Sequence, residues 1–188
     1  MLKKISILGS TGSIGLTTLS IIDKKKKEFK VKFLSADENY KLICKQIIKY
    51  KPEIYLINNL NVYFKVKKKF KKKNIRIINK IEQIEKKFNC DITVSAIPGL
   101  DGLKPTLHMI KLSRNVLIAN KESVICGWDL IKKTANKNNT KIIPVDSEHF
   151  SIFELIKNHK LNEIEKVFIT ASGGPFLNYS INKLKKVT

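Results

Sequence analysis

Short apolar runs rich in Ile and Val alternate along the chain with segments in which apolar residues recur every three to five positions. The first pattern is typical of buried parallel strands and the second of amphipathic helices. The segment 40–50 shows the second pattern most clearly, because Leu42, Ile43, Ile47 and Ile48 would form one apolar face. The pattern predicts strands at Lys4–Leu8, Val31–Ala36, Glu53–Ile57, Arg76–Ile78, Asp91–Ala96, Val116–Ala119, Lys141–Val145 and Lys166–Ala171, and helices at Ile14–Asp23, Tyr40–Tyr50, Val62–Phe70, Lys80–Phe88, Pro105–Leu112 and Glu122–Lys137.

The order of these elements predicts an α/β fold, a Rossmann-like doubly wound parallel sheet with helices on both faces. No internal repeat interrupts the alternation, and the polar stretch Asn136–Thr140 is expected to be a connection. The alternation changes after the run that ends at Val145. We therefore predict one domain over residues 1–145 and the beginning of a second domain over residues 146–188.

The composition is that of a globular protein. With 188 residues, of which 43% are apolar, the chain can bury a substantial core. No apolar run approaches the roughly 18 residues of a membrane span, and the N-terminal residues lack the apolar core of a signal peptide. Cys44, Cys90 and Cys126 are odd in number and far apart, which argues against disulfides and a zinc site. We expect a cytoplasmic protein with no membrane partner.

The formal net charge of +21 raises the question of nucleic-acid binding. However, 35 of the 37 basic residues are Lys, and the other two are Arg76 and Arg114. Arg is favoured where phosphates or bases are recognised, because its planar guanidinium forms paired hydrogen bonds. We expect no specific nucleic-acid partner and attribute the Lys-rich surface to compositional drift in an A/T-rich genome. A basic polyanion-binding module, whose affinity fades as salt rises, is an alternative.

A glycine-rich loop, Gly9–Gly15 (GSTGSIG), lies between the first predicted strand and the first predicted helix. Its G-x-x-G-x-x-G spacing is a variant of the dinucleotide-binding fingerprint. Glycines let the backbone approach a pyrophosphate, and the N-terminus of the following helix favours the negative charge. The position of the loop in the chain therefore predicts a dinucleotide site; a tight turn without a ligand is the alternative.

Two acidic residues, Asp37 and Glu38, follow the second predicted strand. An acid about 20 positions beyond the glycines usually accepts a hydrogen bond from the ribose 2′-hydroxyl and repels a 2′-phosphate. From this chemistry alone the cofactor would be NAD. Lys41, close by in the sequence, is a cation that could compensate for the two acids.

A second candidate site follows the strand predicted at Lys141–Val145, in the run Asp146-Ser147-Glu148-His149. Two carboxylates at positions i and i+2 can converge on one hard divalent cation, and all-oxygen ligation suits Mg²⁺ or Mn²⁺. Asp146 as the N-cap of a helix, with Glu148 in its first turn, is an equally good interpretation. We interpret His149 as a packed, hydrogen-bonded residue, and His108 carries no functional signal.

Two further loops could contact an anion. Asn120-Lys121-Glu122-Ser123 follows a predicted strand, so Lys121 could hold a substrate oxygen or phosphate, although helix capping and a surface charge explain the same residues. Ser172-Gly173-Gly174-Pro175 could present backbone N–H groups to an anion, and a plain turn is the alternative.

Taken together, the motifs resemble those of the 1-deoxy-D-xylulose 5-phosphate reductoisomerase family. The resemblance spans the whole chain and rests on five motifs in order: GSTGSIG (9–15), the Gly99…Gly102-Leu103…Pro105-Thr106 stretch, ANKES (119–123), PVDSEH (144–149) and SGGPF (172–176). A different dehydrogenase family would share the glycine loop but would not explain ANKES or PVDSEH.

The resemblance implies an enzyme that rearranges 1-deoxy-D-xylulose 5-phosphate and reduces the product with NADPH to 2-C-methyl-D-erythritol 4-phosphate, using Mg²⁺ or Mn²⁺. It implies that residues 1–145 bind NADPH, that residues 146–188 begin an α+β catalytic domain, and that the enzyme is a homodimer. The residues implied are Thr11, Gly12, Ser13, Ile14, Asn39, Asn120 and Glu122 for the nucleotide, Asp146 and Glu148 for the metal, and Lys121, Ser147, Glu148 and Ser172 for substrate and catalysis.

This chain departs from the family in two respects. Where the family has Gly followed by Lys or another non-acidic residue, this chain has Asp37 and Glu38. Family members are also considerably longer, and the half beyond these residues supplies a third carboxylate ligand and most of the phosphate-binding residues. We therefore expect a fragment that is inactive by itself. A degraded nucleotide-binding remnant without catalysis is the alternative.

Overall fold

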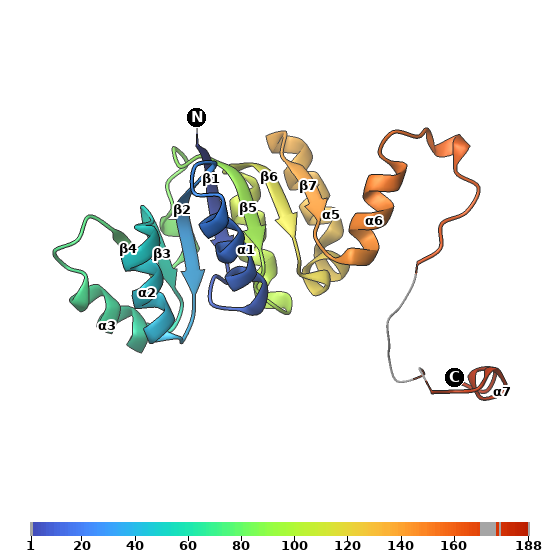
Figure 1. Cartoon of the computed structure of the whole chain (residues 1–188), viewed down its shortest axis with the longest axis horizontal. Coiled ribbons are helices and arrows are strands. Elements are labelled where there is room, and N and C mark those ends of the chain that lie inside the picture. The colour runs from blue at the N-terminus through green and yellow to red at the C-terminus, as the bar shows by residue number, and fades with distance from the viewer. Residues whose placement is uncertain (1, 170–175, 177, 188) are drawn as a thin grey trace. The chain divides into compact units, whose positions relative to one another are not determined.

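The computed structural model of the chain describes residues 2–169, 176 and 178–187 (Figure 1). The chain divides into two compact units, Met1–Ile143 and Pro144–Thr188. The first unit carries the sheet and helices α1 to α5, and the second begins at Pro144, the last residue of β7. The elements in chain order are β1 (Lys3–Leu8), α1 (Ser13–Lys24), β2 (Phe29–Ala36), α2 (Tyr40–Tyr50), β3 (Ile54–Ile57), α3 (Leu60–Lys69), β4 (Arg76–Ile78), η1 (Ile81–Gln83), β5 (Cys90–Ser95), η2 (Leu100–Gly102), α4 (Leu103–Ile110), β6 (Ser113–Ile118), α5 (Lys121–Asn138), β7 (Lys141–Pro144), α6 (Ser147–Ile156), η3 (Leu161–Glu163) and α7 (Ile181–Leu184).

The sheet has seven strands in the order β4-β3-β2-β1-β5-β6-β7. The order runs outward from β1 in both directions, and the pairs from β4 through β6 are parallel. Such a reversal of strand order creates a crevice at the carboxyl ends of β1 and its neighbours, where ligands bind in folds of this kind. The predicted Rossmann-like, doubly wound α/β sheet is confirmed.

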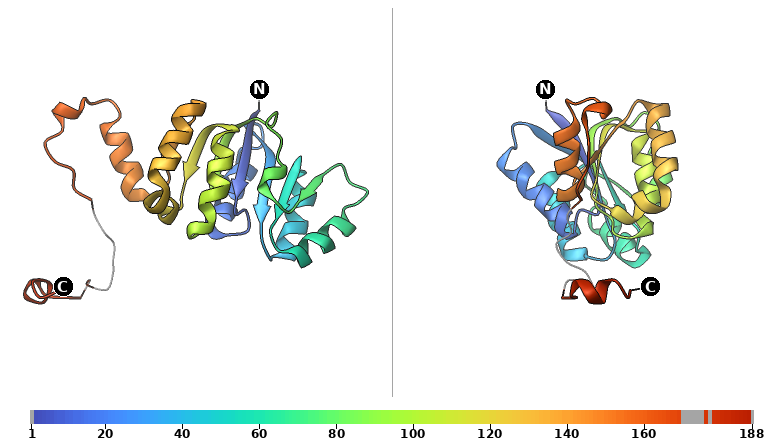
Figure 2. Two further views of the ribbon diagram at one scale, coloured as in Figure 1. Left: turned by 180° about the vertical axis from the view of Figure 1, so that it is seen from behind. Right: turned by 90° about the vertical axis from the view of Figure 1, so that its right-hand side faces the viewer.

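Helices cover both faces of this sheet, as Figure 2 shows for α1 (blue) and α5 (gold). On one face, Leu19 and Ile22 of α1 and Ile43 and Ile47 of α2 pack on β1–β3. On the other face, a core around Phe33 and Met109 joins α4 and the η1 segment to the sheet. A third group of residues joins α4, α5 and β6: Ile110, Val116, Ile118, Ile131 and Ala135. Burial on both faces explains why the central strands are apolar at nearly every position.

Most predicted elements are present with small shifts at their ends. The helix predicted at Lys80–Phe88 is wrong, because only the 3₁₀ turn η1 forms there. The strand predicted at Lys166–Ala171 is wrong for 166–169, which adopt no regular structure, while 170–171 lie outside the described residues. The polar stretch Asn136–Thr140 is only partly a connection, because α5 continues to Asn138 and ends with Asn139 in the left-handed region at φ 52°. Helix α6 was not among the predicted elements.

The structure also bears on the expectations for membrane spans and for the cysteines. Among the described residues no helix combines the length and the apolar character that crossing a bilayer requires. Cys44 and Cys90 are buried, Cys126 is exposed, and all three are free thiols. Burial raises the pKa of the Cys90 thiol, so it stays protonated near neutral pH.

Candidate active site

The glycine loop joins the carboxyl end of β1 to the first turn of α1. Gly9 has a φ of +80°, and a Cβ there would lie 2.7 Å from the carbonyl oxygen of Ala96. Gly15 is buried, and a Cβ there would overlap the carbonyl oxygen of Gly9. Gly12 differs from both, because it is exposed and a Cβ on it would meet nothing closer than 3.5 Å. Two glycines therefore permit the tight turn, and the third leaves the backbone open to a ligand.

The end of β2 holds the loop from one side. The backbone N–H of Gly9 donates to the Ser35 hydroxyl oxygen at 3.0 Å. The backbone N–H of Ser10 donates to the Ser35 carbonyl oxygen at 2.7 Å. Ser10 and Ser35 are buried and Gly9 is half-buried, so these two bonds are shielded from water and fix the position of the loop relative to β2.

A buried polar cluster holds the loop from the other side. The side-chain nitrogen of Gln46, on α2, donates to the Ser10 carbonyl oxygen at 2.8 Å. Its side-chain oxygen accepts from the Ser10 hydroxyl at 2.7 Å and from the Tyr55 hydroxyl at 2.6 Å. Burial raises the pKa of Tyr55, so its hydroxyl stays protonated and available to donate.

The structure leaves the predicted nucleotide-binding residues of the loop accessible. Thr11 is half-buried, and Gly12, Ser13 and Ile14 are exposed at the start of α1. Asn39 is exposed as well, and its side-chain oxygen caps α2 by accepting from the Leu42 N–H at 3.1 Å. The roles of these residues in nucleotide binding stay predictions.

Asn120 connects two loops at the carboxyl edge. Its side chain is the N-cap of α5, accepting from the Ser123 N–H at 2.9 Å. Its side-chain nitrogen donates to the carbonyl oxygens of Ile97 and of Gly99, the latter at 2.7 Å. Asn120 is 3% exposed, and its side-chain amide is occupied by these bonds within the protein, so its role in nucleotide binding stays a prediction. The neighbouring residues Lys121 and Glu122 are exposed in the first turn of α5.

The predicted metal ligands lie in the second unit, at the start of α6. Asp146 is the N-cap, and its Oδ1 accepts from the His149 N–H at 3.0 Å. Glu148 occupies the first turn, with one carboxylate oxygen 3.1 Å from the Ser147 hydroxyl, which donates to it. The helix-cap interpretation of Asp146 is therefore confirmed.

The residue types of this pair fit a hard cation, because both can offer carboxylate oxygens. Two carboxylates are fewer ligands than such a cation takes, so Asp146 and Glu148 would need further ligands to complete a site, and their role as metal ligands stays a prediction. Within the described part of the chain, no group of three or more His, Cys, Asp or Glu side chains is placed to hold a metal.

The two remaining predictions for this region have different outcomes. His149 is hydrogen-bonded, with Nδ1 2.5 Å from Asp146 Oδ1, but its side chain is 54% exposed and therefore not packed. The interpretation of a packed histidine is wrong, because His149 lies in the first turn of α6, a helix with no buried residue. Ser172, predicted to contact substrate, lies outside the described residues.

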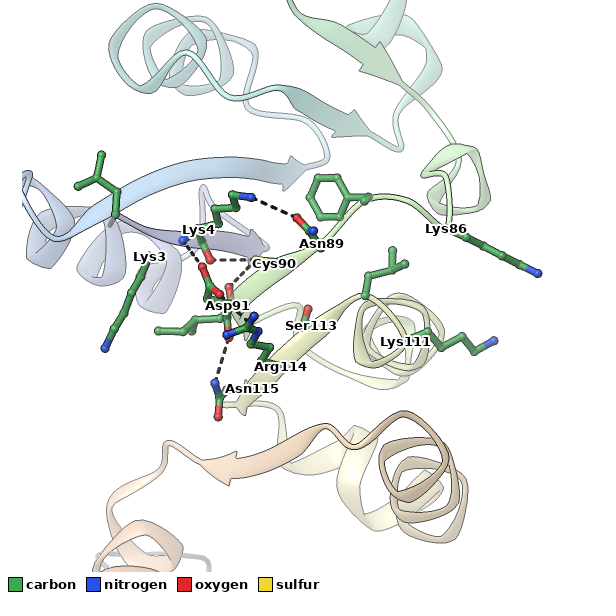
Figure 3. Close-up of a pocket in the computed structure, with 14 residues that line it drawn as sticks. Lys3, Lys4, Lys86, Asn89, Cys90, Asp91, Lys111, Ser113, Arg114 and Asn115 are labelled. Carbon is green, nitrogen blue, oxygen red and sulfur yellow. Dashed lines mark hydrogen bonds and ion pairs between the residues drawn. The ribbon is translucent and has the colours of Figure 1, made fainter.

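A separate cavity of about 720 Å³ lies at the amino edge of the sheet, at the beginnings of β1, β5 and β6 (Figure 3). Near its centre the Lys4 N–H donates to Asp91 Oδ2 at 2.8 Å, and Arg114 Nε lies 3.7 Å from Asp91 Oδ1. The side chains of Lys86 and Lys111 extend away from this centre in Figure 3. Because parallel strands end at the opposite edge, this cavity is not part of the nucleotide site.

Sequence reasoning did not identify Ser35 and Gln46 as contributors to the site. A weak signal was present for both, since each is a polar residue within a buried apolar pattern. Gln46 lies between Ile43 and Ile47 on the inner side of α2, and Ser35 lies within β2. A buried polar side chain needs a hydrogen-bond partner, and here the partner is the glycine loop.

Comparison with known proteins assigns the chain to a family. A family model described as 1-deoxy-D-xylulose 5-phosphate reductoisomerase matches residues 5–127, and a model of the C-terminal domain of the same enzyme matches residues 142–188. The chain belongs to this reductoisomerase family.

Relatives and solved structures agree with this assignment. The reductoisomerase of Pelagibacter ubique is 44% identical over all of this chain and 49% of its own length, and that of Clostridium novyi is 38% identical over all of this chain and 50% of its length. The structure of the Zymomonas mobilis reductoisomerase in complex with NADPH has a TM-score of 0.87 and 30% identity, covering all of this chain and 50% of that protein. The chain thus spans about half the length of the curated relatives it matches.

Proposed function

We propose that this chain is the nucleotide-binding portion of an NADPH-dependent reductoisomerase. The whole enzyme would convert 1-deoxy-D-xylulose 5-phosphate to 2-C-methyl-D-erythritol 4-phosphate with a divalent metal. The observation that carries the proposal is the glycine loop, in which Gly9 and Gly15 pack closely while Gly12 stays open at a helix N-terminus. A related reductoisomerase structure is described as a complex with NADPH, fosmidomycin and magnesium, and covers all of this chain at 29% identity.

The proposed roles follow from the positions of the residues. Thr11, Gly12, Ser13 and Ile14 would bind the dinucleotide at the N-terminus of α1, where backbone N–H groups and the helix dipole favour phosphate. Asn39, Asn120 and Glu122 would contact it from the neighbouring strand ends. The nicotinamide supplies hydride when it is bound.

The second unit would contribute to metal and substrate binding. Asp146 and Glu148 would hold Mg²⁺ or Mn²⁺, whose charge polarises substrate oxygens when it is bound. Ser147 and Ser172 would contact the sugar phosphate. Lys121, which belongs to the first unit, would supply positive charge to an anionic substrate. With only two carboxylates, we expect the 188 residues to hold the metal weakly and to lack catalysis.

The test compares the chain with a fusion protein. The chain would be joined to the remaining half of the Pelagibacter ubique relative, and substrate-dependent oxidation of NADPH would be followed with Mn²⁺. We expect the fusion to be active and the 188-residue chain to bind NADPH without turnover. A fusion that folds and binds NADPH but does not oxidise it with substrate would favour a degraded remnant. Failure of both proteins to bind NADPH would contradict the nucleotide-site proposal.

We also propose that the whole enzyme is a cytoplasmic homodimer. Free thiols at all three cysteines fit a reducing compartment, because no disulfide is needed to stabilise the fold. The dimer rests on the family resemblance alone. Light scattering on the fusion protein would measure its mass, and a monomer at micromolar concentration would contradict the dimer.

A further inference from the structure

The structure fixes where the acidic pair Asp37 and Glu38 lies relative to the glycine loop. Ser35, two residues before Asp37, is hydrogen-bonded through its hydroxyl and carbonyl oxygens to the backbone of Gly9 and Ser10. The acidic pair is therefore held beside the loop that would bind the pyrophosphate. A nucleotide on that loop would extend its adenosine ribose toward the end of β2.

The chain on the other side of the pair is fixed as well. Asn39 caps α2 by accepting from the Leu42 N–H at 3.1 Å, and the Tyr40 N–H donates to the Glu38 carbonyl oxygen at 2.7 Å. Asp37 and Glu38 are thus held between two anchored residues, Ser35 and Asn39. Their backbone cannot move far from the end of β2 without breaking these bonds.

Both carboxylates are exposed and unneutralised. Across the described ranges 2–169, 176 and 178–187, neither side chain takes part in a hydrogen bond or an ion pair. Lys41, in the first turn of α2, is exposed and forms no ion pair with either of them. Two free carboxylates would accept hydrogen bonds from ribose hydroxyls and repel a 2′-phosphate, which carries about two negative charges.

We propose that Asp37 and Glu38 are the specificity-determining residues of the nucleotide site, and that they make this chain accept NADH about as well as NADPH. The inference rests on the proposed function, because it requires a dinucleotide on the glycine loop. Asp37 and Glu38 act on binding and take no part in the chemistry of hydride transfer.

The experiment titrates the chain with NADH and, separately, with NADPH, following nicotinamide fluorescence. We expect dissociation constants within about tenfold of each other. In Asp37→Asn and Glu38→Gln, NADPH should bind about fivefold more tightly per carboxylate removed, while NADH binding stays equal or weakens. These gains should shrink in about 1 M salt, where the Debye length is roughly 3 Å.

Glu28→Gln is the matched control. Glu28 is exposed next to the amino end of β2, so the variant has the same change in net charge at the opposite edge of the sheet. It should leave both affinities unchanged. Circular dichroism would verify that each variant folds.

The possible outcomes separate the inference from the proposed function. Binding of neither dinucleotide would overturn both. NADPH bound more than about 100-fold more tightly than NADH, with no effect of Asp37→Asn or Glu38→Gln, would overturn the inference alone. The inference would also be overturned if Lys41→Gln lowered NADPH affinity about tenfold while Asp37→Asn and Glu38→Gln left it unchanged. Lys41 would then be the residue that determines specificity.

Discussion

Gln46 holds Ser10 at two atoms at once, donating to its carbonyl oxygen at 2.8 Å and accepting from its hydroxyl at 2.7 Å. Helix α2 thereby fixes the first polar residue of a loop that lies 36 positions earlier in the sequence. The shape of the glycine loop therefore depends on this contact as well as on the close packing of Gly9 and Gly15.

Replacing Gln46 should damage both folding and nucleotide binding. In Gln46→Leu, the buried Ser10 carbonyl and Tyr55 hydroxyl lose partners, which should lower the free energy of unfolding by about 1–3 kcal/mol. Urea unfolding and a fluorescence titration with NADPH would measure the two effects. Lys45→Leu, at an exposed position of the same helix, serves as the control. Equal stability of the two variants would mean that Gln46 does not support the loop.

The glycines at positions 12 and 15 should respond differently to Ala. Gly12 has a φ of −78° and an open Cβ position, so Gly12→Ala should change the free energy of unfolding by less than about 1 kcal/mol. It should nevertheless weaken NADPH binding at least about tenfold, because the methyl group would meet the pyrophosphate. Gly15→Ala should instead destabilise the fold, since its Cβ would overlap the Gly9 backbone. Undiminished NADPH binding by a folded Gly12→Ala variant would contradict the open-backbone argument.

Asp146 has a structural role and a proposed metal-binding role, and two substitutions separate them. Asp146→Asn keeps a good N-cap but removes the carboxylate, so Mn²⁺ affinity should fall at least about tenfold while α6 remains. Asp146→Ala should lose the cap as well, at a further cost of about 1 kcal/mol. Electron paramagnetic resonance of free Mn²⁺ would follow binding. Unchanged Mn²⁺ affinity in Asp146→Asn would show that Asp146 acts only as a helix cap.

His108 should make the stability of the first unit depend on pH. Its Nε2 is buried, and among the side chains described it lacks a hydrogen-bond partner. Burial, followed by the positive charge of Lys111, lowers the pKa of His108 below its ordinary value of 6.5, although Glu82 opposes this. The folded state therefore binds a proton less readily than the unfolded state.

The sign of the effect follows from that difference. The stabilisation is complete above about pH 6.5 and is lost as the pH falls from there through the lowered pKa of the folded state. Urea unfolding from about pH 8 to about pH 5 should show a fall in the free energy of unfolding of the native sequence. The fall should be smaller in His108→Leu. Identical pH profiles for the two proteins would contradict this role of His108.

The sequence pattern predicted the strands of the sheet well, because strands buried on both faces are short apolar runs. It failed at Lys80–Phe88 for a specific reason. Ile81, Ile84 and Phe88 are all buried as a helix would bury them, but Arg76 donates to the Gln83 carbonyl oxygen at 2.6 Å. The backbone of Ile84 is extended, with φ −77° and ψ 120°, so the chain leaves the 3₁₀ turn directly after Gln83.

The error at Lys166–Ala171 has another cause. Val167, Phe168 and Ile169 are 53%, 82% and 66% exposed, and a strand needs a neighbouring strand to satisfy its backbone. Local apolar pattern cannot show whether such a partner exists.

The candidate site was predictable where the chemistry is local and not where it depends on distant contacts. Gly12 follows from the spacing of one short motif, and the capping of α6 by Asp146 follows from residue type. The attachment of Asn120 to Ile97 and Gly99 joins residues more than 20 positions apart, which no periodicity reports.

The polar cluster of Ser10, Gln46 and Tyr55 also bears on how the protein is made. All three residues belong to the first 55 positions, and Ala96, which lies against Gly9, completes the surroundings of the loop well before Asp146. Domains of growing chains fold from the N-terminus as they are synthesised. The glycine loop and its supports would therefore be able to fold before the proposed metal ligands Asp146 and Glu148 have been synthesised, so the dinucleotide could bind while the chain is still on the ribosome.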